Sequence, residues 1–332
     1  MTVVKAIFSH LHIFLLAILL TVVPYKGLEL PVINTAKDDA KLVAELIADT
    51  HLEAKEPFRR SFMKTGFRHL SRAKIDIDAV VVAGDLTNYA DEPSLAEYYR
   101  ILKEYSPAVA ISCAGNHDIG HAGDRDVTDI SREEAKANFI AYNNAYLGID
   151  ATDNYYSYEV NGYRFIVIGD ICYDGGHWDD LDLGAEQLAF LDRELAEATA
   201  QGQPAFVVCH WPVDGMNGQE TIWPGSGIDL SKNDVKSVME KYRNVFYISG
   251  HMHTGIKSRI IGEKYGLASV ETVNGVTYIA LPTYGLVNSF GDPLFGTGMQ
   301  LEVYDDEVII RPRNFITNTW YTNAVYEIEL VG

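Results

Sequence analysis

AVVVAGD, at residues 79–85, is the stretch that decides the fold: five apolar residues are followed at once by Gly84 and Asp85. Such a run is typical of a β-strand that is buried on both faces. A polar side chain directly at the end of a buried strand needs a partner, because burying it alone costs free energy. In α/β sheets functional groups gather where strands end in loops, so we expect Asp85 to belong to a site.

The same pattern, an apolar run that ends in a polar motif, occurs at four other places in the chain. The motifs are Asp49-Thr50-His51, Gly115-Asn116-His117-Asp118, His210 and Gly250-His251-Met252-His253. Helices are predicted at about residues 56–73, 94–105, 131–143, 185–200 and 233–242. Strands that alternate with helices predict an α/β fold. The late strands, at about 268–280 and 299–330, suggest a second sheet that packs on the first.

One predicted helix, at about residues 56–73, carries the basic stretch FRHLSR at residues 67–72. We expect this stretch to be a solvated face, with His69 exposed.

The motifs together supply enough carboxylate, imidazole and amide groups to hold two metal ions. Two-metal hydrolases keep their ions about 3.5–4 Å apart and need a bridging carboxylate, for which Asp85 is the natural candidate. The predicted ligands are Asp49, His51 and His253 for one ion and Asn116, His210 and His251 for the other. This mixture of donors suits Fe, Mn or Zn better than Ca or Mg. The ions would share a water, lower its pKa and present hydroxide to phosphorus.

His117 is left over from the ligand set and is predicted to be catalytic. It would protonate the leaving alkoxide or stabilise charge on the phosphoryl oxygens. Asp118 could hold its imidazole in place. Asn88, Trp211 and Tyr284 lie beside the metal-bearing loops and are candidate substrate contacts. Each motif alone is common by chance, and a buried histidine is more often a satisfied core group; five motifs in this order on strand ends are not.

From about Leu42 to Leu281 the pattern resembles the calcineurin-like metallophosphoesterase superfamily. GDLTNYADEPSLAEYYRIL (84–102), GNHD (115–118) and GAEQLAFLDRELAEA (184–198) are similar to its cyclic-nucleotide and glycerophosphodiester phosphodiesterase branch. The resemblance implies a four-layer αββα sandwich of two mixed β-sheets flanked by helices, with a dinuclear site and the ligand roles given above. His210 is followed by Trp211, where that branch often has a second histidine. This departure does not affect the ligand, but it leaves the residues of the substrate pocket undecided.

The composition limits the substrate. The chain has 332 residues and a net charge of −19, whereas a nucleic-acid binder normally shows a basic face, so a duplex substrate is disfavoured. A small phosphoester remains compatible, because two divalent ions reverse the local field. The three cysteines (Cys113, Cys172 and Cys209) have no disulfide spacing and are expected to be buried; a Cys209 ligand is conceivable but not needed.

The N-terminus carries an unbroken apolar run at residues 13–23. Eleven residues suit the core of a signal peptide better than a membrane span. We therefore expect residues 1–27 to be a signal peptide or membrane anchor, attaching through residues 6–23, and the protein to be extracytoplasmic, either secreted or anchored. The alternative is a buried N-terminal helix or strand. Residues 28–332 would form the metallophosphoesterase domain, with a strand-rich extension from about 295.

Three functions compete at this stage. The first is a phosphodiesterase acting on a small or lipid-derived diester, and the second is a phosphomonoesterase or nucleotidase on the same metal core. The third is a scaffold that has lost catalysis, which would lack ligands or His117, and none is missing. A P-loop kinase or ATPase is excluded because the chain has no G-x-x-x-x-G-K-[ST] motif.

Overall fold

The computed structural model describes residues 36, 38–72, 76–120, 130–171, 181–254, 256, 269–286, 295–321 and 324–332. The predicted signal peptide or anchor at residues 1–27 lies outside them. Among the described residues no helix is both long and apolar enough to cross a membrane.

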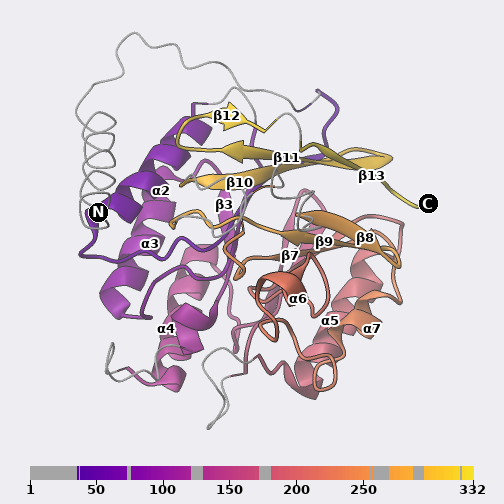
Figure 1. Cartoon of the computed structure of the whole chain (residues 1–332), viewed down its shortest axis with the longest axis horizontal. Helices are drawn as coiled ribbons and strands as arrows, with labels where there is room; N and C mark the ends of the chain where they lie inside the picture. Colours follow the sequence, from indigo (N-terminus) through magenta and orange to yellow (C-terminus); the bar gives the residue numbers. More distant parts are fainter. Residues whose placement is uncertain are drawn as a thin grey trace.

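Two mixed β-sheets form the centre of the molecule (Figure 1). The first has the order β12-β11-β10-β1-β2-β3, with β13 also paired to β11. Its strands are β1 (Leu42–Ile47), β2 (Ala79–Ala83), β3 (Val109–Cys113), β10 (Thr297–Val303), β11 (Glu307–Asn314), β12 (Thr319–Trp320) and β13 (Tyr326–Glu329). The second has the order β4-β5-β6-β7-β9-β8. Its strands are β4 (Tyr156–Val160), β5 (Tyr163–Val167), β6 (Ala205–Val208), β7 (Val245–Ser249), β8 (Val270–Val273) and β9 (Val276–Ala280).

Helices cover the outer face of each sheet, which confirms the predicted αββα sandwich (Figure 1). On the first sheet these are α2 (Pro57–Leu70), α3 (Glu92–Tyr105) and α4 (Arg132–Leu147). On the second they are α5 (Gly184–Ala198) and α7 (Val235–Met239), and the short helix α6 (Gln219–Ile222) lies in the loop after β6. A shared core fills the space between the sheets, where Leu46 and Met299 of the first meet Phe206 and Ile248 of the second.

The sequence suggests that the late strands form a second sheet. In the structure the last strands of the chain, β10 to β13, belong to the first sheet instead. β10 pairs antiparallel with β1 and continues the first sheet through β11, whereas the second sheet is built from the middle of the chain. The apolar composition of these strands gives their type but not their partner, because a strand pattern does not specify which sheet edge the strand joins.

Parallel pairing sets the position of the candidate site. β1, β2 and β3 run parallel to one another, as do β5, β6, β7 and β9. The carboxyl ends of parallel strands meet at the same edge of a sheet, so the polar motifs that follow them are brought together.

Candidate metal centre

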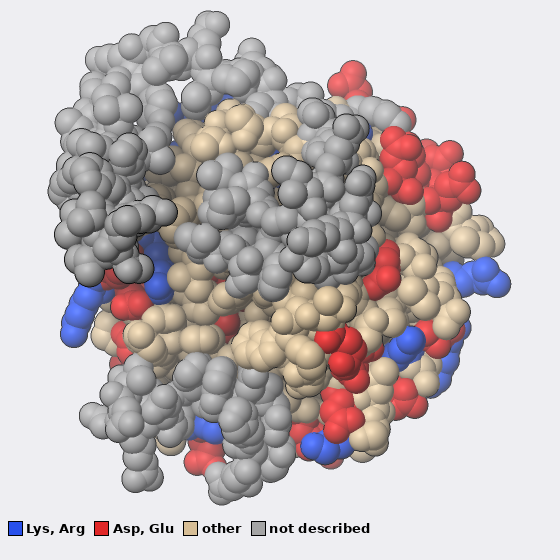
Figure 2. Space-filling view, viewed as in Figure 1, with Lys and Arg blue, Asp and Glu red and all other residues tan. Residues whose placement is uncertain are grey.

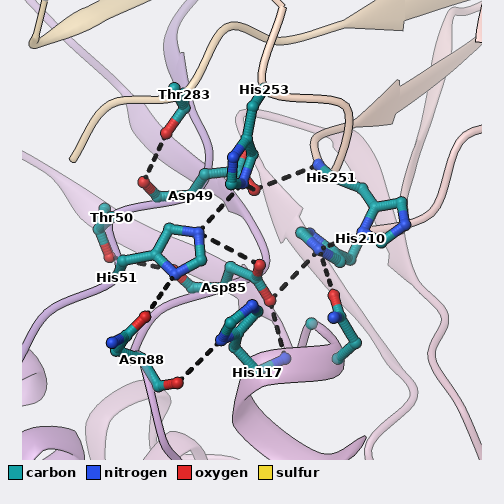
Figure 3. A network of polar contacts seen from close by, with 12 residues as sticks. Asp49, Thr50, His51, Asp85, Asn88, His117, His210, His251, His253 and Thr283 are labelled. Carbon is teal, nitrogen blue, oxygen red and sulfur yellow. Dashed lines mark hydrogen bonds and ion pairs between the residues drawn. The ribbon is translucent and has the colours of Figure 1, made fainter. Parts of the chain in front are cut away.

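The polar motifs from both sheets converge at one edge of the sandwich, with their side chains pointing toward one another (Figure 3). Backbone hydrogen bonds join the loops that carry them. The N–H of Asp49 donates to the carbonyl of Gly84 at 3.0 Å, and the N–H of Gly250 donates to the carbonyl of His210 at 3.0 Å. The positions of the side chains are therefore set by both sheets and not by one loop.

A first ligand cluster consists of Asp49, His51, Asp85 and His253, whose ligand atoms all lie within 4.8 Å of one another. Nε2 of His51 is 3.1 Å from Nε2 of His253 and 3.4 Å from Oδ2 of Asp85. Ligand atoms that surround one ion at bond lengths of about 2.0–2.2 Å are themselves about 3.0–3.5 Å apart. Oδ2 of Asp49 is buried with no hydrogen-bond partner, and a cation would supply one.

A second cluster consists of Asn116, His210, His251 and again Asp85. Nε2 of His210 lies 3.0 Å from Oδ1 of Asn116, 3.2 Å from Nδ1 of His251 and 3.2 Å from Oδ1 of Asp85. Asp85 thus turns one oxygen toward each cluster, as a bridging carboxylate must (Figure 3). The residues present fit two ions, one in each cluster.

Hydrogen bonds on the far side of two imidazoles fix which ring nitrogen is free to bind metal. Nδ1–H of His210 donates to the carbonyl of Ala83 at 2.9 Å, and Nδ1–H of His51 donates to Oδ1 of Asn88 at 3.1 Å. Each bond requires a proton on Nδ1 and leaves Nε2 as the ligand, an arrangement typical of metal-binding histidines.

The backbone at the candidate ligands is in the left-handed region, which non-glycine residues rarely adopt. The residues with positive φ at the site are Asp49, His51, Asp85, His251 and His253. Strain of this kind collects at functional sites, where the surrounding structure enforces it.

Glycines in the motifs allow the loops to approach closely. A Cβ on Gly84 would lie 2.5 Å from Nδ1 of His210, and one on Gly115 would lie 2.2 Å from Oδ1 of Asp85. The glycines that precede Asp85 and Asn116 are therefore required by the geometry of the site.

The charges of the site are strongly coupled. Burial would raise the pKa of Asp85, but the imidazoles of His210 and His117 outweigh it and hold the pKa well below its usual value. Burial would lower the pKa of His210, but the Asp85 carboxylate raises it to about 9. Burial lowers the pKa of His51 well below its usual value, so this ring is neutral and available as a ligand. The Asp85 carboxylate thus favours positive charge beside it, and a bound metal ion would provide that charge.

His117 lies on the open side of the first cluster, at the start of the π-helical turn η1 (Asn116–Gly120). Its ring is 4.6 Å from the ring of His51, and its Nδ1–H donates to the carbonyl of Asn88 at 2.8 Å. His117 and His253 are only partly buried, whereas the other candidate ligands are almost fully buried. Substrate therefore has access to the site past these two histidines.

The prediction that Asp118 holds the imidazole of His117 is wrong. Both oxygens of Asp118 accept hydrogen bonds from the loops around the site: from the N–H groups of Leu86, Thr87 and Gly115 and from the Thr87 hydroxyl, at 2.8–3.0 Å. The backbone carbonyl of Asn88 takes the role that was assigned to Asp118. Asp118 joins the loops after β2 and β3 instead.

Two of the three predicted substrate contacts differ from expectation, and the third, Asn88, lies half-buried at the site. Trp211 is 1% exposed and packs edge-on against the ring of His210, so it supports a ligand from behind. Tyr284 is 1% exposed, and its hydroxyl donates to the carbonyl of Phe62 on α2, inside the core. The amide of Asn88 is held between His51 and Glu53.

Sequence reasoning missed several residues around the ligands. Oε1 of Glu53 accepts from Nδ2 of Asn88 at 2.8 Å and from Nη1 of Arg59 at 3.0 Å, and Arg59 also donates to the carbonyl of His51. Trp223 stacks on His251. Glu53 and Arg59 lie within eight residues of His51, which is the signal that could have drawn attention to them; Trp223 has no such signal.

Comparisons with known proteins agree with this geometry. The family model for calcineurin-like phosphoesterases matches residues 46–255. Among solved structures, a dimetal phosphatase from Danio rerio superposes with a TM-score of 0.58 at 14% identity, covering 88% of this chain and 100% of that one. A purple acid phosphatase from yellow lupin (Lupinus luteus) seeds superposes with a TM-score of 0.58 at 15% identity, covering 87% of this chain and 53% of that one. A search of curated proteins found no match.

Proposed function

Because this chain belongs to the calcineurin-like phosphoesterase family, we propose that it is a dinuclear-metal hydrolase that cleaves a small or lipid-derived phosphodiester. The observation that carries the proposal is Asp85, whose two oxygens lie 3.4 Å from Nε2 of His51 and 3.2 Å from Nε2 of His210. The similarity of residues 84–102 and 184–198 to the cyclic-nucleotide and glycerophosphodiester branch favours the diester.

Each part of the site has a defined role in this proposal. Asp49, His51 and His253 would hold one ion and Asn116, His210 and His251 the other, with Asp85 offering one carboxylate oxygen to each cluster. This donor set suggests Fe, Mn or Zn, and such ions, when bound, would supply a bound water of lowered pKa and polarisation of the phosphoryl oxygens. His117 stands on the open side and protonates the leaving oxygen.

Phosphomonoester hydrolysis is the second candidate. Both superposed structures are phosphatases by name, and the metal core is compatible with either ester.

The net charge of −19 supports a small substrate over a nucleic-acid duplex, and acidic and basic side chains are interspersed over the described residues in Figure 2.

The test uses the full chain, loaded with Mn²⁺, and compares kcat/KM on bis(p-nitrophenyl) phosphate and p-nitrophenyl phosphate. Faster cleavage of the diester is the expected result. Faster cleavage of the monoester would move the assignment to the second candidate. Two bound ions without turnover of either ester would favour the catalytically silent scaffold.

We also propose that residues 1–27 export or anchor the protein, on the strength of the apolar run at residues 13–23. Fractionation of the native cells, with sequencing of the N-terminus of the mature protein, tests this. Recovery of the chain from the cytoplasm would contradict it.

A further inference from the structure

Trp223 is a large aromatic residue that is exposed to solvent, where its apolar surface is unfavourable. Among the described residues three large apolar side chains are exposed, and Trp223, at 42%, is the only aromatic one. The other two, Val325 and Val331, lie near the C-terminus. An exposed tryptophan beside a polar site is a common mark of ligand binding.

The indole of Trp223 lies against the second ligand cluster. Its ring is stacked on the imidazole of His251, with centroids 5.0 Å apart and planes 13° from parallel. His251 stacks on one face of the indole, and the residue as a whole stays 42% exposed. The indole therefore lies beside the second ligand cluster, with part of the residue open to solvent.

The segment that carries Trp223 is held in place. The carbonyl of Trp223 accepts from Nε2 of Gln219 at 2.9 Å and from the hydroxyl of Ser226 at 2.8 Å. Gln219 and Ser226 are both buried, and Oγ of Ser226 is 3.4 Å from Sδ of Met252, the residue between His251 and His253. The backbone that carries the indole is thus fixed near the metal ligands, and the indole itself rests on His251, which lowers the entropic cost of using it to bind a ring.

We propose that Trp223 forms a stacking subsite beside the second ligand cluster, which takes the planar aromatic or heteroaromatic group of a small phosphoester. This inference rests on the proposed function, because the phosphoryl group of the same substrate would be held at the metal centre. A flat ring gains stacking contact on the indole that an alkyl group of similar size does not. The substrate class is therefore an aryl or nucleoside-like ester and not a purely aliphatic one.

The test compares phenylphosphonate with methylphosphonate, two probes that share the phosphonate and have no scissile ester. Their Kd values are measured by titration calorimetry on the full, Mn²⁺-loaded protein and on Trp223→Ala and Trp223→Phe. We expect Trp223→Ala to weaken phenylphosphonate by about three- to tenfold and to leave methylphosphonate within about twofold. Trp223→Phe should retain most of the preference.

Val331→Ala is the control, since Val331 is also exposed but bonds to Asn244, at the opposite end of β7 from His251. It should change neither Kd. Equal weakening of both probes by Trp223→Ala, or fewer than two bound ions, would mean that the indole only holds His251 and would overturn the subsite. An unchanged preference for phenylphosphonate would overturn it as well. Failure of methylphosphonate to bind the loaded wild-type protein would instead overturn the proposed function.

Discussion

Two regions of the molecule, one on the first sheet and one at the strand ends of both sheets, bury charged side chains and neutralise their charge in different ways. On the outer face of β1, β10 and β11, Nη1 of Arg313 lies 3.0 Å from Oε1 of Glu45, and both residues are 0% exposed. Beside them Nε of Arg311 lies 3.0 Å from Oε1 of the buried Glu302. In this outer-face charge cluster every carboxylate has a guanidinium of its own.

The metal centre, at the strand ends of both sheets, has imidazoles and, among the described residues, no guanidinium beside the carboxylates of Asp49 and Asp85. Imidazole nitrogens face each other at 3.1 Å between His51 and His253 and at 3.2 Å between His210 and His251. An oxygen of Asp49 is buried without a partner. The outer-face charge cluster also leaves Oε2 of Glu45 and Nε of Arg313 without a hydrogen-bond partner in the described part of the chain, but it pairs opposite charges. The metal centre instead sets imidazole against imidazole, an arrangement that cations would complete.

The largest effect should come from removing the carboxylate that joins the two ligand clusters. Asp85→Ala should lose both ions and lower kcat/KM by at least about 1,000-fold, because the ions supply several kcal/mol of transition-state stabilisation. Elemental analysis and steady-state rates measure both effects. Asp305→Ala, at a side chain that is 84% exposed, is the control. Retention of two ions by Asp85→Ala would show that the bridge is misassigned.

His117 should affect chemistry and not metal content. His117→Ala should keep both ions and lower kcat by about 100-fold or more on esters with poor leaving groups, where a general acid matters most. Esters of p-nitrophenol, which leaves without a proton, are the internal control. Equal losses on good and poor leaving groups would argue against proton donation by His117.

A substitution of Asn88 tests whether the metal affinity depends on residues that hydrogen-bond to a ligand but do not bind an ion themselves. Asn88→Ala removes the acceptor for Nδ1–H of His51 but keeps the backbone carbonyl that holds His117. Metal affinity at the first cluster should fall by about 10- to 100-fold, while the dependence on leaving group stays unchanged. Competition with a chelator measures the affinity.

Asn138→Ala, at a half-buried residue on α4, is the matched control and should bind metal normally. If Asn88→Ala also bound metal normally, the hydrogen bond to His51 would have no part in forming the site.

The sequence predicted the α/β class and the convergence of the motifs because both depend on local signals, whereas the αββα arrangement followed from the resemblance to the family. A buried strand followed by Asp, Asn or His can be recognised within ten residues, and parallel strands put such ends at one edge. It did not predict contacts that depend on distant packing. His69 was expected to be exposed, but Nδ1 of His69 bonds to the carbonyl of Phe315 and the side chain is buried, since the end of β11 packs against α2.

The same limit explains the errors inside the site. Asp118 adjoins His117 in the chain, yet the carbonyl that holds His117 comes from Asn88, 29 residues away. Trp211 follows the ligand-bearing strand β6 and Tyr284 follows β9, which carries no ligand, but both side chains turn into the core because each strand end is also a packing position. Position directly after a strand was enough to predict the metal ligands, because the backbone at the strand end sets where they lie. It was not enough for side chains whose direction is set by tertiary packing.

The smallest effect concerns the outer-face charge cluster and its response to pH. Burial raises the pKa of Glu45 to about 7, outweighing Arg313, whereas the carboxyl of an unfolded chain titrates near 4.5. Between these values the folded state holds a proton that the unfolded state has released. The contribution of Glu45 to the free energy of unfolding is therefore complete below pH 4.5 and is lost as the pH rises to about 7, by at most about 1.4 kcal/mol per pH unit.

Glu45→Gln should remove this slope, because its amide does not titrate. Urea unfolding of the chelator-treated protein from pH 4.5 to 7.5 measures it, and the difference between wild type and variant cancels the groups of the metal centre. Glu186→Gln, at an exposed position on α5, should leave the slope unchanged. Parallel curves for wild type and Glu45→Gln would mean that Arg313 keeps Glu45 ionised throughout. The outer-face charge cluster would then be closed by charge alone, which would sharpen its contrast with the metal centre.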